Sequence, residues 1–200
     1  MNRLLQGDVG SGKTVVAAAC AYFAWQNGCQ AALMAPTELL AQQHQRTMET
    51  LLAGTGLRVG LLVGSMTAAQ KRDCRAALAA GALDLIVGTH ALLSEGVSFR
   101  RLGLVITDEQ HRFGVDQRAA LAAKSGEKDR PHVLVMSATP IPRTLALMIY
   151  GDLDLSVIDQ LPPGRTPVAT YLIREDKRAR LYAFVRKQVA QGRQVYIVCP

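Results

Sequence analysis

The chain has 200 residues, of which 49% are apolar and 20% charged, a balance that excludes a disordered or collagen-like chain. Lys and Arg number 23 and Asp and Glu 16, so the formal net charge of +7 favours a polyanionic partner. No uncharged apolar stretch reaches the roughly 18 residues of a membrane span, and the four cysteines form no Cys-x-x-Cys pair that would indicate a zinc or redox motif.

In chain order, short apolar runs alternate with longer stretches of helical periodicity. The pattern predicts strands at 3–6, 30–35, 59–63, 83–88, 102–108 and 132–137, and helices at 13–27, 38–53, 68–80, 116–124 and 142–150. In the second helix, Leu40, His44, Met48 and Leu51 share one face. Strands that alternate with helices are typical of βαβ units, so we predict an α/β fold with a mostly parallel sheet flanked by helices.

A break rich in Pro and Gly separates this pattern from a shorter one. We predict a first domain at 1–158, a linker at 159–166 and the incomplete start of a second α/β domain at 167–200. That start would hold a strand at 168–173, a helix at 176–191 and a strand at 194–198, packed loosely or against the first domain. The short first strand and the strand at the very end suggest a piece of a longer protein.

A glycine-rich loop follows the first predicted strand and opens the first helix. It matches the pattern G-x-x-x-x-G-K-[ST] at every fixed position, with the residues Gly7, Asp8, Val9, Gly10, Ser11, Gly12, Lys13 and Thr14. Glycines let the backbone curl so that successive N–H groups and the helix N-terminus form an anion cradle. We expect Lys13 to reach the β- and γ-phosphates of ATP and the Thr14 hydroxyl to ligate Mg²⁺. An ordinary glycine-rich turn is the alternative.

The strand at 102–107 ends in the polar run Asp108, Glu109, Gln110 and His111. Ligands of open α/β sheets bind at the carboxyl ends of strands, where the phosphate loop also lies. We therefore expect Asp108 to lie beside Thr14 as a metal ligand and Glu109 to act as the general base for the attacking water. Gln110 and His111 are expected to link the nucleotide state to neighbouring loops. A solvated acidic turn is the alternative.

Three nearby residues receive no role in this site. Asp84 lies at the start of its strand, which is the wrong end of the sheet, and Asp116 is more simply a helix cap. Thr107 is polar where a buried strand usually carries an aliphatic residue, and we expect its hydroxyl to bond locally.

The motifs and their order resemble those of superfamily 2 helicases. Residues 7–14 resemble motif I, 35–44 motif Ia, 88–93 motif Ib, 108–111 a variant of the DEAD/DEAH box and 137–139 motif III. Four blocks, at 7–14, 108–115, 137–145 and 161–168, resemble bacterial RecG DNA helicases, and the resemblance spans essentially the whole chain. The transcription-repair coupling factor is the alternative, but that family usually carries Glu where Gln110 stands and lacks the Pro-rich run at 162–167.

The resemblance implies a RecA-like P-loop NTPase fold and a motor, driven by ATP with Mg²⁺, that moves on branched duplex DNA. Its substrates would be stalled forks and Holliday junctions in bacterial DNA repair and recombination. The chain would hold the first of two motor lobes and the beginning of the second. The missing second lobe, with its arginine finger, and a wedge domain would be partners within the same protein. No membrane partner is implied, and the expected location is the bacterial cytoplasm.

The resemblance also implies DNA-contacting and coupling residues. Those expected to line the path of a DNA strand are Pro36, Thr37, Glu38, Gly88, Thr89 and His90. Those expected to couple the nucleotide state to other loops are Gln110, His111, Ser137 and Thr139. Phosphate contacts suit a motor that holds the backbone without reading bases, and Arg100, Arg101, Arg112 and Arg143 are further candidates for them. As a structural alternative, Thr37 would simply cap its helix.

Two other classes of function remain open on the sequence alone. A P-loop kinase for a small metabolite would use the same phosphate loop, but it leaves the run at 137–139 unexplained. A nucleotide-gated binding module would bind ATP without hydrolysing it. Stimulation of ATP hydrolysis by branched DNA separates the motor from the kinase, and the substitution Glu109→Gln separates catalysis from binding alone.

Overall fold

The computed structural model describes residues 1–108, 121, 124, 130–139, 153–160 and 168–198. The chain divides into two compact units, Met1–Pro163 and Gly164–Pro200, and each is described by itself. The predicted helix at 142–150, and most of the one predicted at 116–124, lie outside the described residues. No helix in the described ranges combines the length and the apolar character that crossing a membrane requires.

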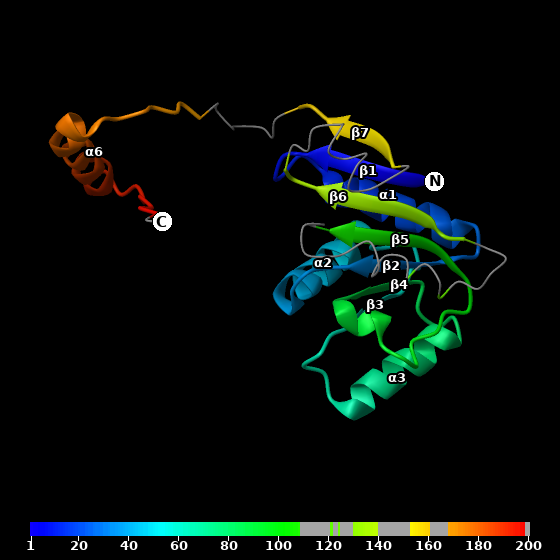
Figure 1. The fold of residues 1–200 in the computed structure, drawn as a ribbon. Coiled ribbons are helices and arrows are strands. Elements are labelled where there is room, and N and C mark those ends of the chain that lie inside the picture. Colours follow the sequence, from blue (N-terminus) through cyan, green and yellow to red (C-terminus); the bar gives the residue numbers. More distant parts are fainter. Residues whose placement is uncertain (109–120, 122–123, 125–129, 140–152, 161–167, 199–200) are drawn as a thin grey trace. The chain divides into compact units, whose positions relative to one another are not determined.

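The first unit is built on a parallel sheet (Figure 1). Its strands in the described residues are β1 (Asn2–Gly7), β2 (Gln30–Met34), β3 (Val59–Leu62), β4 (Leu85–Gly88), β5 (Leu102–Asp108), β6 (His132–Ser137) and β7 (Asp154–Ile158). They lie in the order β3-β4-β2-β5-β6-β1-β7, and every neighbouring pair runs parallel. Crossovers between parallel strands require helices or long connections. The predicted α/β fold with a parallel sheet is therefore confirmed.

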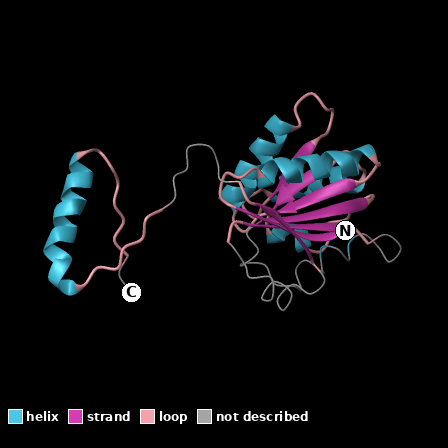
Figure 2. Ribbon diagram, turned by 90° about the horizontal axis from the view of Figure 1, so that it is seen from above, coloured by secondary structure: helices cyan, strands magenta, loops and turns pink. Residues whose placement is uncertain are grey.

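Helices connect the strands of the sheet (Figure 2), and two of them begin at a residue whose side chain caps the helix. They are α1 (Lys13–Gln26), α2 (Glu38–Leu51), α3 (Ala68–Ala79) and the short 3₁₀ helix η1 (His90–Leu93). Thr37 caps α2, because its side chain accepts a hydrogen bond from the Leu40 N–H at 3.3 Å. At the start of α3, Thr67 and Gln70 form a reciprocal capping box.

The side chains of alternate strand residues pack into two buried clusters, one on each face of the sheet. Leu33 of β2 packs in the cluster that holds Met48 of α2. Its neighbour Met34 packs on the opposite face in the cluster that holds Leu78 of α3 and Leu92 of η1. Helices therefore cover both faces, and the strands between them are as apolar as a parallel sheet requires.

One of the four residues predicted to share a face of α2 is exposed. Leu51 is 42% exposed, although Leu40, His44 and Met48 face the core as predicted. The reason lies in the end of the helix: Leu51 is its last residue, and the following Leu52 turns inward and is buried instead.

Strand β7 is an element that the sequence prediction missed. Its sequence, Asp-Leu-Ser-Val-Ile, alternates polar and apolar residues, which is the pattern of a half-buried strand. It pairs with β1 at the edge of the sheet, and Arg3 of β1 donates a hydrogen bond to the Ser156 hydroxyl at 2.7 Å. The alternation is a signal that could have identified this strand.

The second unit contains a 3₁₀ turn, η4 (Glu175–Lys177), and helix α6 (Arg178–Ala190). The predicted helix at 176–191 is confirmed, but the predicted strands at 168–173 and 194–198 are wrong. A strand needs a neighbour for its N–H and C=O groups, and within this unit neither described segment pairs with another. The large apolar side chains of Leu181, Phe184 and Val189 on α6 are exposed.

Candidate functional site

Five sequence motifs come together at one edge of the sheet. Because all strands run parallel, their carboxyl ends lie on the same side (Figure 1). The motifs follow five consecutive strands, β4, β2, β5, β6 and β1. The residues that the structure describes in them are 88–93, 35–44, 108, 137–139 and 7–14. This is the edge at which ligands of open α/β sheets bind.

The phosphate loop has a backbone that requires its glycines. Gly10 and Gly12 have φ of 82° and 96°, in the left-handed region that side chains disfavour. A Cβ on Gly7 would lie 2.6 Å from the Ser11 Oγ and 3.1 Å from the Ile158 Cβ, so the loop packs closely against β7. Gly12 is the N-cap of α1 and offers no side chain to its first N–H groups. Those donors are therefore available to an anion.

Lys13 turns back over the beginning of the loop. Its Nζ donates hydrogen bonds to the carbonyl oxygens of Gly7 at 2.7 Å and Asp8 at 2.9 Å. The side chain is half-buried, and its contacts are made to the loop rather than to the core. The ammonium group is thus held over the loop that the sequence predicts to hold phosphates.

Asp108 ends β5 and is held by a histidine from another element. Its Oδ2 lies 2.7 Å from Nε2 of His44 on α2, and both side chains are nearly buried, at 14% and 11% exposed. The sequence prediction treated His44 only as part of the apolar face of its helix. Glu109, Gln110 and His111, the predicted base and coupling residues, lie outside the described residues.

Thr107 does not behave as predicted. Its side chain is fully buried, but its hydroxyl has no hydrogen-bond partner among the described residues. The neighbouring positions on β2 and β6 are Met34 and Val135, which offer no strong side-chain acceptor. The predicted local hydrogen bond is therefore wrong.

The run at 137–139 forms a tight hydroxyl-bonded turn after β6. The Ser137 Oγ lies 3.0 Å from the Thr139 Oγ1 and accepts a hydrogen bond from the Thr139 N–H at 3.2 Å. The turn contacts β1, because Gln6 donates from its side-chain amide to the Thr139 carbonyl at 3.2 Å. Gln6 directly precedes the phosphate loop, so a change in this turn would reach the loop through one hydrogen bond.

The predicted strand-contacting residues after β2 are half-buried. Thr37 serves as the cap of α2, which is the structural alternative that the sequence left open. Glu38 accepts a hydrogen bond from the Ser65 N–H at 3.1 Å, and its hydrogen bonds to Ser65 lower the pKa of its carboxyl. The start of α2 is thereby tied to the loop after β3.

The residues after β4 differ in exposure. A Cβ on Gly88 would lie 2.3 Å from the Leu62 carbonyl oxygen, so glycine is required there by the close approach of β3. Thr89 is buried, and its hydroxyl lacks a partner among the described residues. His90 is exposed. Of these three side chains, His90 is the accessible one.

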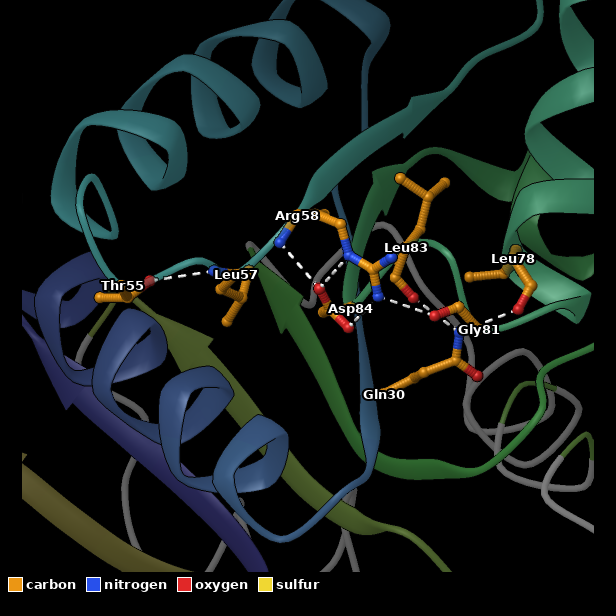
Figure 3. Close-up of polar contacts among 8 residues, drawn as sticks. All are labelled: Gln30, Thr55, Leu57, Arg58, Leu78, Gly81, Leu83 and Asp84. Atoms are coloured by element: carbon orange, nitrogen blue, oxygen red, sulfur yellow. Dashed lines mark hydrogen bonds and ion pairs between the residues drawn. The ribbon is translucent and has the colours of Figure 1, made fainter.

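The opposite, amino edge of the sheet carries a closed polar network (Figure 3). The Asp84 carboxylate accepts hydrogen bonds from the Arg58 backbone N–H at 2.9 Å and from its guanidinium at 2.8 and 2.9 Å. Burial by itself would raise the pKa of Asp84, but the bonds and charge of Arg58 prevail and lower it. The expectation that Asp84 stands at the wrong end of the sheet for the site is confirmed.

Gln30 completes this network. Its amide donates to the carbonyls of Leu78 and Leu83 at 2.9 and 2.7 Å and accepts from the N–H groups of Arg100 and Arg101 at 2.8 and 3.1 Å. Arg100 and Arg101 therefore precede β5 at the amino edge, away from the motif-bearing edge. A pocket of about 600 Å³, lined by residues such as Phe23 and Arg101, also lies at this end, and Arg101 is its one lining residue that the sequence analysis proposed for a phosphate contact.

Comparison with known proteins identifies the family. Residues 1–148 match the DEAD/DEAH box helicase family. The chain is 57% identical over 200 residues to the ATP-dependent DNA helicase RecG of Synechocystis sp. and 52% identical to that of Bacillus subtilis. The whole chain is covered in both cases, but it spans only 24% and 29% of those relatives' lengths.

Solved structures give the same result. The structure of RecG bound to a three-way DNA junction matches the whole chain with a TM-score of 0.80 and 46% identity, and 26% of that chain is covered. A DEAD box protein from Methanococcus jannaschii shares the fold, with a TM-score of 0.59 and 21% identity over 79% of this chain and 46% of that one. The resemblance to RecG in the sequence blocks is confirmed. The chain belongs to the DEAD/DEAH box helicase family.

Proposed function

We propose that this chain is the ATP-binding lobe of a DNA helicase motor that couples ATP hydrolysis to the remodelling of branched DNA. The observation that carries the proposal is the position of the phosphate loop and Asp108. They end strands β1 and β5, which flank β6, at the same edge of one parallel sheet. A Mg²⁺-dependent phosphoryl-transfer site needs this proximity of a phosphate cradle and a carboxylate.

ATP would bind to the curled loop at residues 7–14. The first N–H groups of α1 would meet phosphate oxygens, since the N-cap glycine leaves them without a side-chain acceptor. Lys13 would exchange its two carbonyl partners for the β- and γ-phosphates, a stronger interaction because both groups are charged. Lys13 thus acts in both binding and catalysis.

The residues present fit a magnesium ion. Thr14 and Asp108 offer hard oxygen donors, which Mg²⁺ prefers, and Oδ1 of Asp108 has no hydrogen-bond partner among the described residues. When bound, the ion would neutralise charge on the phosphates. Glu109 is proposed as the general base that orients and deprotonates water, which is consistent with its position directly after Asp108.

Coupling is assigned to Gln110, His111, Ser137 and Thr139. The hydroxyl-bonded turn at 137–139 supports this role, because Thr139 contacts Gln6 immediately before the phosphate loop. A shift of the loop on hydrolysis would therefore displace the turn. A second motor lobe and a wedge domain of the same protein are the partners proposed to respond to it.

DNA contacts are assigned to Pro36, Thr37, Glu38, Gly88, Thr89 and His90. They follow the adjacent strands β2 and β4 at the motif-bearing edge. The contacts would come from backbone groups and from the exposed His90, because the carboxylate of Glu38 repels phosphate and the Thr89 side chain is buried. The RecG structure bound to a three-way DNA junction supports branched DNA as the substrate. A bacterial cytoplasmic location belongs to the same proposal.

The test compares DNA-dependent ATP hydrolysis by the full-length protein and its Glu109→Gln variant. We expect branched DNA to raise turnover several-fold more than linear duplex does. The variant should keep nucleotide binding and lose about 10²- to 10⁴-fold in turnover, the usual contribution of a general base.

If the rate of ATP hydrolysis is the same with and without DNA, the proposed helicase function is contradicted and the kinase alternative is favoured. Unchanged turnover in Glu109→Gln would remove Glu109 from the mechanism. The relatives described above give no support to the coupling-factor or kinase alternatives.

A further inference from the structure

The hydrogen bond between His44 and Asp108 joins two elements that are far apart in the sequence. His44 lies in the second turn of α2, and Asp108 is the last residue of β5. Their Nε2 and Oδ2 atoms are 2.7 Å apart, and the two side chains are 11% and 14% exposed. The contact is thus short and largely shielded from solvent.

The chemistry of the pair fixes the direction of the bond. An ionised carboxylate only accepts hydrogen bonds, so the proton lies on Nε2 of His44 and is donated to Oδ2 of Asp108. This bond restrains rotation of the carboxylate and leaves Oδ1 without a partner among the described residues. With respect to the part of the chain that the structure describes, the restrained carboxylate therefore keeps one oxygen available at the motif-bearing edge.

The surroundings of His44 argue against a purely space-filling role. Its neighbours on the buried face of α2 are Ala41 and Met48, which are completely buried and apolar. An apolar residue would suit that face, whereas an imidazole requires a partner to offset its loss of water contacts. The partner that it finds is the carboxylate at the end of β5.

The contrast with Asp84 strengthens the argument. Asp84 uses both of its oxygens on Arg58, and the pair forms part of a closed network at the amino edge. Among the described residues, Asp108 accepts a hydrogen bond through one oxygen only, and its partner is an imidazole rather than a guanidinium. A single imidazole N–H orients the carboxylate of Asp108, whereas the guanidinium of Arg58 occupies both oxygens of Asp84.

We propose that His44 is a positioning residue that holds the Asp108 carboxylate in the orientation required to bind Mg²⁺ with ATP. This assignment rests on the proposed function, because it supposes that Asp108 is the metal ligand. It adds the last residue of the segment that resembles motif Ia, outside the phosphate loop and the acidic motif. Partners of metal ligands typically contribute 10- to 100-fold to metal affinity.

The experiment uses the full-length protein with three substitutions. His44→Leu removes the donor and keeps an apolar side chain, and His44→Gln keeps an N–H donor at comparable reach. Gln45→Leu is the matched control, because it removes a hydrogen bond from the same helix, the one between Gln45 and Glu49 at 2.9 Å, without touching Asp108. The probes are Mn²⁺, followed by its paramagnetic resonance signal in the presence of ATP, and a fluorescent ATP analogue in EDTA.

We expect His44→Leu to weaken Mn²⁺ binding by about 10-fold or more and to raise the Mg²⁺ concentration for half-maximal turnover by a similar factor. Binding of the ATP analogue in EDTA should stay within about twofold, because the phosphate loop is intact. His44→Gln should recover most of the metal affinity, and Gln45→Leu should match wild type.

Equal metal affinity in wild type and His44→Leu would overturn the assignment, as would a failure of His44→Gln to differ from His44→Leu. If His44→Leu does not fold, His44→Asn takes its place, because its amide is too short to reach Asp108. The proposed function fails separately, and only if the wild-type protein itself shows no Mg²⁺-dependent nucleotide binding.

Discussion

The two edges of the sheet use polar side chains in opposite ways. At the amino edge, Arg58 and Asp84 bond to each other, and Gln30 bonds to the neighbouring backbone (Figure 3). At the carboxyl edge, the hydroxyls of Thr89 and Thr107 are buried without a partner in the described part of the chain.

The difference indicates which edge serves stability and which serves ligands. A buried polar group without a partner costs about 1–3 kcal/mol, so it persists where another function requires it. In the closed network, both oxygens of Asp84 are used on Arg58, and the amide of Gln30 is used on backbone groups. The phosphate loop and Asp108 retain donors and an acceptor at positions where phosphate and metal would bind.

The largest expected effect comes from the carboxyl edge. Lys13→Ala should lower the ATP turnover of the full-length protein by about 100-fold or more, because it removes a charge aimed at the transferred phosphate. The free energy of unfolding should change by only about 0.5 kcal/mol, since the side chain contacts the loop and not the core. Turnover and urea unfolding, measured on the same preparation, check both parts. A variant that unfolds instead would place Lys13 among the structural residues.

At the amino edge, a substitution should lower the free energy of unfolding and leave nucleotide binding unchanged. Gln30→Leu leaves the Leu83 carbonyl and the N–H groups of Arg100 and Arg101 without their partner, and the Leu78 carbonyl keeps only its hydrogen bond from the Gly81 N–H. The free energy of unfolding should therefore fall by about 3 kcal/mol. Nucleotide affinity of the folded variant should be unchanged. Gln26→Leu on the exposed side of α1 is the control and should shift stability by about 0.5 kcal/mol at most. Loss of nucleotide affinity in Gln30→Leu would show that the two edges are not independent.

The Arg58–Asp84 pair predicts a dependence on pH. Arg58 lowers the pKa of Asp84, so the pair's contribution is complete above the ordinary carboxyl pKa of about 4 and disappears as pH falls through the lower pKa of the folded state. Arg58→Met should therefore destabilise the protein by about 1 kcal/mol at pH 7 and by less at pH 3. Urea unfolding of the wild type and of Arg58→Met at pH 7 and at pH 3 measures the two differences in the free energy of unfolding. Equal differences at the two pH values would contradict the prediction.

The smallest expected effect concerns Thr107. Thr107→Val keeps the shape of the side chain and removes a buried hydroxyl that lacks a partner in the described residues, so stability should rise by up to about 1 kcal/mol. Thermal unfolding checks this prediction. A loss of stability would show that the Thr107 hydroxyl has a hydrogen-bond partner in the folded protein. A lower rate of DNA-stimulated ATP hydrolysis would show that this hydroxyl contributes to the function of the candidate site.

Some features of the molecule follow from contiguous sequence. The loop at residues 7–14 is determined locally, because its glycines set the backbone and its lysine and threonine stand at fixed distances along the chain. The apolar runs of β5 and β6 likewise identify strands that are buried on both faces. Such features depend on neighbours a few residues away, and so the pattern alone predicted them.

Other features were decided by the tertiary structure. The sequence placed His44 in the core, but only the packing of α2 on β5 brings it to Asp108. The segments at 168–173 and 194–198 have the composition of strands and form none, because a strand requires partners that no local pattern can supply. The sequence alone determined the phosphate loop and most of the described helices and strands of the first unit. Strand order and long-range hydrogen bonds decided which polar groups met, because those contacts join residues far apart in the chain.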